Sequence, residues 1–148
     1  MKYAHILLFS FTQNFCLANN QSKIQLVHGS DGPWVALGFQ MGKDAAKKLE
    51  MKSKEDLKVI HYGPFEVQYT CIADGIKASL GIDNIQYEKA EKAQLRSEII
   101  NIKTGKKLIF RPTDSFFTLY FNLPDLQLHE KAKEVLTSPN EIIFTVKN

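Results

Sequence analysis

The sequence has few of the residues that cross-link small proteins. It contains only two cysteines, Cys16 and Cys71, in 148 residues. That number excludes a disulfide-rich scaffold, and it also excludes an iron–sulfur cluster held by four thiolates. A chain of this length buries enough apolar surface to fold as one domain without such cross-links.

Long apolar runs are also missing. The run at residues 4–11 falls well short of the ~20 residues that a membrane-spanning helix needs, so we expect no transmembrane segment. It follows Lys2 and precedes the small residue Ala18, a layout typical of a secretory signal peptide. We therefore expect residues 1–18 to be a signal peptide and residues 19–148 to be one mature domain, periplasmic or secreted. A buried N-terminal strand is the alternative.

Charge of one sign does not dominate the chain. The net charge of +3 comes from 19 basic and 16 acidic residues. The lysines between Lys43 and Lys54 are interrupted by acidic residues, whereas nucleic-acid binding needs a continuous positive surface. We expect no nucleic-acid partner.

The hydrophobic pattern predicts a single α+β domain with a mixed or largely antiparallel sheet. Two of its helices are expected near a ligand cleft, and a third near the C-terminus. Helix starts are indicated by Pro33 after Ser30 or Asp31, by Thr70 or Cys71, and by Asp125. The predicted helices run from Pro33 to Leu49, over 71–80, and from Asp125 to the residues before Ser138; the predicted strands are 23–27, 59–70 with a bend at Gly63–Pro64, 94–102, 107–113, 116–122 and 141–148.

Gly38 and Gly42 lie inside the first predicted helix, where each costs about 1 kcal/mol relative to alanine. Because the two are four positions apart, they share one helix face. This pattern predicts that another backbone approaches that face closely.

Two side chains that can carry chemistry lie near the predicted helix starts. His28 precedes the first helix, and Cys71 opens the second. A helix N-terminus carries unpaired N–H groups and partial positive charge, so it favours an anion or a thiolate. If both helices begin at the same end of the sheet, His28 and Cys71 converge on one cleft.

Several short motifs follow one another between residues 24 and 121. These are His28-Gly29, Pro33, 36-ALGFQMG-42, then 71-CIADGIK-77 with Cys71, Asp74 and Ile76, and finally 108-LIFRPTDSFFTLY-120. By the order and spacing of these motifs together, rather than by any one of them, the chain resembles the FmdE-like family, which is named after a component of formylmethanofuran dehydrogenase.

The resemblance implies a metal-binding domain, because family members look like metal binders through histidine and cysteine. Here Ser30 and Gly32 stand where the family has its second histidine and a cysteine. His28 and Cys71 remain, with Asp31 or Asp74 as a third ligand for a divalent ion such as zinc. The dehydrogenase activity in the family's name belongs to a large complex with other components, so we do not expect it of this chain.

Three functions compete at this point. The first is a module that binds a metal ion or small molecule in a cleft lined by His28, Trp34 and Cys71, with His61 as a further candidate. The second is a thiol-dependent enzyme in which Cys71 pairs with His28 or His61. The third is a protein-interaction module, such as a homodimer, that uses the strand 116–121 or the last strand as an exposed edge.

Each candidate also has a structural interpretation. His28 satisfies a loop carbonyl, Cys71 is a small buried apolar residue, and Asp74 is a hydrogen-bond acceptor in the first turn of its helix. His61 lies at an exposed edge, and Trp34 fills the cleft. The sequence leaves these alternatives open.

Overall fold

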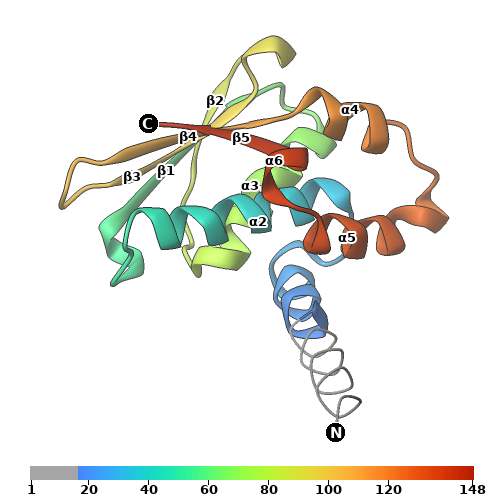
Figure 1. Ribbon diagram of the computed structural model, residues 1–148, viewed down its shortest axis with the longest axis horizontal. Helices are drawn as coiled ribbons and strands as arrows, with labels where there is room; N and C mark the ends of the chain where they lie inside the picture. The colour runs from blue at the N-terminus through green and yellow to red at the C-terminus, as the bar shows by residue number, and fades with distance from the viewer. Residues whose placement is uncertain (1–16) are drawn as a thin grey trace, which may run out of the picture.

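The computed structural model describes residues 17–148. Five strands form one sheet, and α2 (Pro33–Lys48) and α3 (Val67–Leu80) lie side by side against it (Figure 1). The helix α5 (Leu128–Thr137) packs on α2. The fold is therefore the predicted single α+β domain.

The sheet is mixed, as predicted. Its order is β2-β1-β3-β4-β5, with β1 parallel to β2 and all other neighbours antiparallel. A connection containing Gly105, at φ +74°, joins β3 to β4. The strands are β1 (Leu57–Gly63), β2 (Gln86–Lys89), β3 (Arg96–Asn101), β4 (Lys107–Pro112) and β5 (Phe144–Lys147).

The helices α2 and α3 pack closely because glycines face each other across their contact. A Cβ atom added to Gly38 would overlap the backbone carbonyl of Ile72, and one added to Gly75 would overlap the carbonyl of Val35. A Cβ at Gly42 would meet the hydroxyl of Ser79 instead. The predicted close approach of another backbone is confirmed at Gly38, whereas the nearest neighbour of Gly42 is a side chain.

Two predicted strands are helices. Residues 17–28 are helical, although Ile24 and Leu26 were assigned to one face of a strand. Ile24 is fully buried whereas Leu26 is 86% exposed, so the two point in different directions. The buried positions Gln21 and Ile24 follow helical spacing, which a short window centred on 23–27 does not display.

The aromatic segment 116–122 also differs from its prediction. It belongs mostly to α4 (Asp114–Tyr120), which begins where the Thr113 hydroxyl accepts a hydrogen bond from the Phe116 N–H. Phe116 and Tyr120 are both buried and are four positions apart, as on one face of a helix. This segment therefore offers no exposed strand edge for a partner, although β5 does lie at an edge of the sheet.

The predicted start of α2 at Pro33 is confirmed, but the start of α3 and the N-cap of α2 were placed inaccurately. The helix α3 begins at Val67 rather than at Cys71, so Cys71 lies in its second turn. Gly32, not Ser30 or Asp31, is the N-cap of α2, and Pro33 is at its first position. At the C-terminal end, the short helices η3 (Asp125–Gln127) and α6 (Asn140–Ile143) flank α5, and η1 (Lys54–Asp56) and η2 (Lys92–Gln94) precede β1 and β3. The strand β2 was not predicted.

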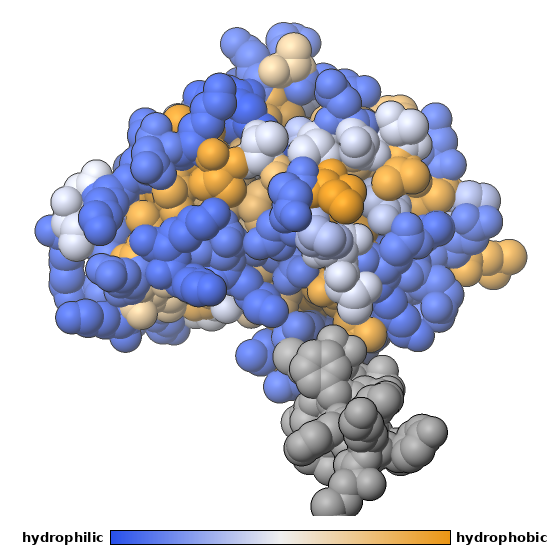
Figure 2. Space-filling model, viewed as in Figure 1, coloured by the Kyte–Doolittle hydropathy of each residue, from blue (hydrophilic) through white to orange (hydrophobic). Residues whose placement is uncertain are grey.

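The predicted signal peptide, 1–18, lies almost entirely outside the described residues. Within 17–148, no helix combines the length and the apolar character needed to cross a bilayer. The surface seen in Figure 2 is mainly hydrophilic, with separate apolar areas between the polar side chains.

Candidate functional site

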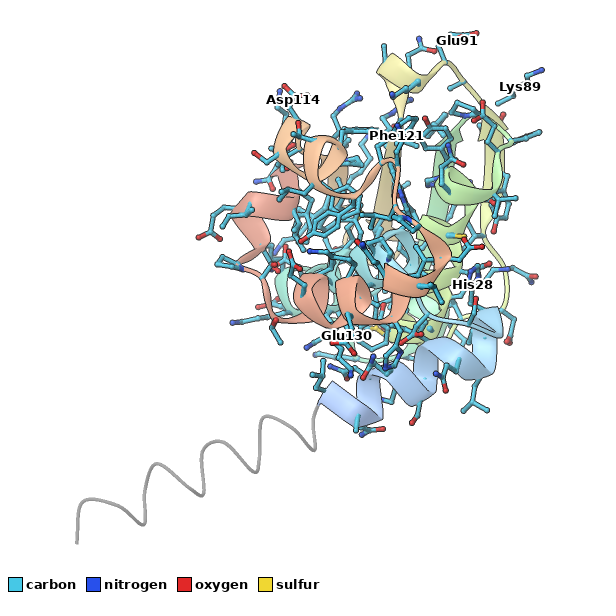
Figure 3. The ribbon with its side chains drawn as sticks, turned by 90° about the vertical axis from the view of Figure 1, so that its right-hand side faces the viewer. His28, Lys89, Glu91, Asp114, Phe121 and Glu130 are labelled. Atoms are coloured by element: carbon cyan, nitrogen blue, oxygen red, sulfur yellow. The ribbon has the colours of Figure 1, made fainter. Side chains whose placement is uncertain are left out.

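The N-terminal helix positions His28. This residue is the last of the helical segment 17–28, and the chain then turns at Gly29, whose φ is +83°. The Gly29 N–H still donates to the Gln25 carbonyl at 2.8 Å, which closes the last turn. Because a positive φ favours glycine, this turn brings the end of the helix close to α3 (Figure 3).

The imidazole of His28 lies between two side chains of α3. Its Nε2 is 3.2 Å from the Cys71 sulfur, and its Nδ1 is 2.8 Å from Oδ2 of Asp74. Cys71 and Asp74 are three positions apart and therefore share one face of the helix. A neutral ring that donates Nδ1–H to the carboxylate keeps Nε2 as an acceptor for the thiol proton. The three groups thus form a chain from carboxylate to imidazole to thiol.

The thiol of Cys71 is protonated at neutral pH. Burial raises its pKa to about 11, and the negative charge of Asp74 adds to this effect. The predicted stabilisation of a thiolate by a helix start is therefore wrong, because α3 begins at Val67 and not at Cys71. Any reaction of this sulfur needs its proton to be removed, and His28 is the base in contact with it.

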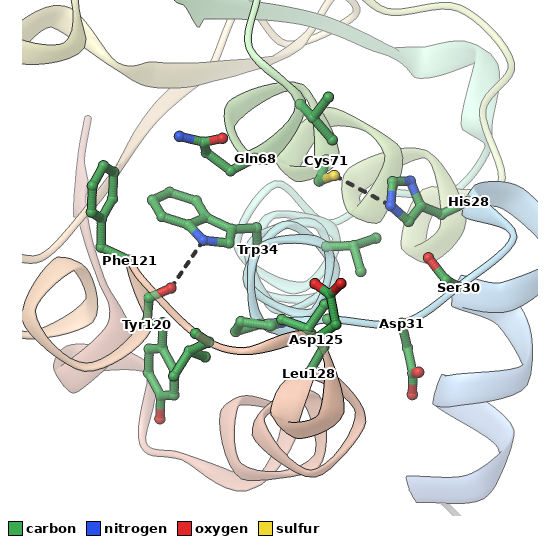
Figure 4. A pocket seen from close by; sticks show the side chains of 15 residues that line it. His28, Ser30, Asp31, Trp34, Gln68, Cys71, Tyr120, Phe121, Asp125 and Leu128 are labelled. Atoms are coloured by element: carbon green, nitrogen blue, oxygen red, sulfur yellow. Dashed lines mark hydrogen bonds between the residues drawn. The ribbon is translucent and has the colours of Figure 1, made fainter.

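A pocket of about 350 Å³ opens beside this pair (Figure 4). Three parts of the chain line it: the segment from His28 into α2, the first turns of α3, and the stretch from the end of α4 to α5. The thiol of Cys71 and the ring of His28 lie at one wall. The lining residues are His28, Ser30, Asp31, Gly32, Pro33, Trp34, Val35, Val67, Gln68, Cys71, Tyr120, Phe121, Leu123, Asp125 and Leu128.

Trp34, the only tryptophan of the chain, forms part of the aromatic side of the pocket. Its indole N–H donates to the Tyr120 carbonyl at 3.2 Å, which fixes the ring against α4. The ring of Phe121 is 6.5 Å from it in an edge-to-face arrangement. Such pairs add to the packing energy and hold both rings in place. Trp34 is therefore a rigid wall.

His61 does not line this pocket. It is on β1 and is buried, with its Nδ1 2.8 Å from the Ser97 hydroxyl on β3. Its Nε2 has no hydrogen-bond partner among residues 17–148. Burial lowers the pKa of His61 to about 4, so the ring is neutral. The predicted places for His61, in the cleft or at an exposed edge, are both wrong.

Comparison with known families supports the resemblance. A family model described as "FmdE, Molybdenum formylmethanofuran dehydrogenase operon" matches residues 27–145. The chain belongs to the FmdE family. The match extends beyond the sequence motifs to include α5 and the first residues of β5. No curated protein gives a significant match to the chain.

The donors that this FmdE domain retains do not fit a zinc site with three protein ligands. Among residues 17–148, no group of three or more histidine, cysteine, aspartate or glutamate side chains is arranged to hold a metal ion. Asp74 binds the far nitrogen of His28, on the side away from Cys71. Asp31 accepts a hydrogen bond from Gln21 and contacts His129. The proposed ligands therefore do not converge on a single point.

Several lining residues of the pocket were not found from the sequence. Tyr120 and Phe121 were assigned to a strand, and Asp125 was assigned only a capping role. Gln68 was placed in an extended segment. One sequence signal could have identified α4 as a helix. Phe116 and Tyr120 are apolar and four positions apart, which is helical spacing.

Proposed function

We propose that this FmdE domain binds a small organic molecule in the pocket beside Cys71 and His28, as an extracytoplasmic protein that lacks dehydrogenase activity of its own. The pocket supports this proposal most strongly. Its volume of about 350 Å³ lies within the usual range for small-molecule sites. Apolar walls and a few convergent polar groups, as found here, are the general features of such sites.

The donor set favours an organic ligand over a metal ion. Within the described part of the chain, 17–148, only Cys71 and His28 are within coordination reach of a common point, and catalytic zinc takes three protein ligands. Equilibrium dialysis against zinc tests this. We expect no stoichiometric retention, whereas one zinc per chain that is lost in Cys71→Ser would assign the site to a metal.

Ligand binding is testable through the thiol itself. A molecule seated in the pocket covers Cys71, so benzyl alcohol should slow its alkylation by iodoacetamide. Peptide mass spectrometry follows Cys71 separately from Cys16. Trp34→Ala enlarges the pocket and removes an aromatic wall, so the protection should weaken. Equal alkylation rates with and without benzyl alcohol, at saturating concentration, would contradict the proposal.

The extracytoplasmic location is supported by the N-terminal sequence pattern. Lys2, the apolar run and Ala18 form the layout of a signal peptide. N-terminal sequencing of the protein isolated from its native cells tests it. We expect the mature chain to begin at Asn19, and a mature chain that begins at Met1 would overturn this part of the proposal.

A thiol-dependent enzyme is the second candidate, and the order Asp74–His28–Cys71 favours it. In this arrangement His28 takes the proton from Cys71 as the sulfur attacks a carbonyl carbon, and Asp74 stabilises the ring. With p-nitrophenyl acetate, the sulfur would form an S-acetyl bond as p-nitrophenolate leaves, and water would then release acetate. Repeated turnover that Cys71→Ala abolishes would support this function. A single acetylation without turnover would exclude it for this ester.

A further inference from the structure

The walls of the pocket carry an unusual balance of charge. The whole chain has a net charge of +3, yet no lysine or arginine is among the residues that line the pocket. Two carboxylates are among them, Asp31 and Asp125. The pocket is therefore acidic although the protein is basic. The negative charge available to a ligand depends on whether each of the two carboxylates is already paired with another group.

Asp31 is already compensated. It accepts a hydrogen bond from the Gln21 amide at 2.8 Å and lies 2.8 Å from the ring of His129. In Figure 4 its carboxylate points away from Cys71, out of the pocket. The carboxylate of Asp31 therefore connects the N-terminal helix to α5 rather than binding a ligand in the pocket.

Asp125 is not compensated. Its side chain is exposed, and within residues 17–148 its carboxylate makes neither a hydrogen bond nor an ion pair. In Figure 4 this carboxylate extends over the pocket, opposite the wall that carries Cys71. A ligand in the pocket therefore meets one free negative charge.

Several basic groups lie near the pocket but contact other residues. His28 contacts Asp74, which also lies 3.9 Å from Lys77, and His129 contacts Asp31. Lys92 lies over the ring of Phe121 at 4.2 Å, but it lines the neighbouring cleft. Among residues 17–148, no lysine or arginine lines this pocket to bind a carboxylate or phosphate there.

We propose, on the basis of the ligand-binding function above, that the pocket selects organic cations, namely protonated amines with an apolar or aromatic body. The amine pairs with Asp125, and the body packs against Trp34, Phe121 and Leu123. Aromatic rings attract cations through their negative faces, so the aromatic wall adds to the same preference. Anionic ligands meet the charge of Asp125, and no lysine or arginine lines the pocket to offset it.

Three probes of nearly equal size test this inference: benzylamine, benzyl alcohol and phenylacetate. Each is titrated into the full chain at low ionic strength, with Trp34 fluorescence as the readout, since Trp34 is the only tryptophan. We expect the protonated amine to bind about three- to fivefold more tightly than the alcohol, as for an exposed charge pair. Phenylacetate should bind more weakly than the alcohol, and added salt should reduce both differences.

Asp125→Asn should reduce the affinity of the amine to about that of the alcohol, so that the preference for the cation is lost. Asp83→Asn is the matched control, because it removes another exposed carboxylate, one that pairs with Lys54 beyond the far end of α3. It should leave the preference intact. If phenylacetate binds as well as the amine, or if Asp125→Asn has no effect, the inference is wrong while the pocket still binds ligands. If none of the three probes binds, the proposed function fails and the inference fails with it.

Discussion

The sulfur of Cys71 lies 3.2 Å from Nε2 of His28, although the two residues are 43 positions apart. Asp74 holds the opposite nitrogen of the same ring. One histidine at the end of the N-terminal helix thus connects two side chains of α3. The charge of Asp74 therefore acts on the Cys71 thiol as well as on the imidazole.

Asp74→Asn should lower the pKa of Cys71 from about 11, because the carboxylate disfavours the thiolate next to it. Burial, the larger cause, is unchanged by the substitution, so the pKa should stay above the ordinary value of a free thiol. The rate of iodoacetamide alkylation as a function of pH measures it. Asp83→Asn removes a distant carboxylate and should leave the pH profile of Cys71 alkylation unchanged. An equal shift of that profile in Asp83→Asn would contradict a local effect of Asp74.

Gly38→Ala should destabilise the protein by about 2 kcal/mol or more, because overpacking exceeds the gain in helix propensity. The added methyl group would overlap the backbone carbonyl of Ile72, which cannot rotate away. Gly42→Ala, one turn later on the same face, meets the side chain of Ser79, which can rotate. Urea denaturation should show a much smaller loss for Gly42→Ala. Equal losses would contradict this account of the α2–α3 contact.

His61 should make the protein less stable in acid. Its pKa is about 4 in the folded state against 6.5 for an ordinary histidine. Below pH 6.5, the unfolded chain therefore binds a proton that the folded chain does not. The free energy of unfolding is therefore unaffected by His61 above the ordinary pKa of histidine. It decreases as the pH falls from that value toward the pKa of His61 in the folded protein, by roughly 3 kcal/mol at most.

Urea unfolding at several pH values between these limits measures this loss. His61→Gln keeps a group that can bond to the Ser97 hydroxyl but does not titrate. Its stability should fall less steeply with acid than that of the unaltered protein. Parallel curves for the two proteins would exclude His61 as the source.

Asp31→Ala should loosen the N-terminal helix. The carboxylate contacts Gln21 in that helix and His129 on α5, so its removal breaks both connections. Hydrogen exchange of the amides in 17–28 should become faster, and alkylation of Cys71 should also rise as His28 moves away more often. Asp125 lines the same pocket but lacks these contacts, so Asp125→Ala should not change the exchange of 17–28.

The sequence alone predicted much of the framework. The glycines at positions 38 and 42 indicated the close contact of α2 with a neighbour, because only a missing Cβ permits such a distance. The predicted strands 94–102 and 107–113 correspond to β3 and β4, which pair antiparallel. The motifs around His28 and Cys71 indicated the family. These features depend on local backbone geometry or on residues close in the chain, and both can be read along it.

Tertiary structure alone decided the chemistry of the pocket. His28 donates to Asp74 and lies beside Cys71 only because the helix 17–28, of which 23–27 was predicted as a strand, ends against α3. Likewise, Asp125 and Trp34 line one pocket only because the chain that follows α4 passes beside the start of α2. A short stretch of sequence shows the periodicity of a helix or strand, but not the direction in which the chain continues after it. A pocket formed by segments that are distant in the sequence depends on those directions.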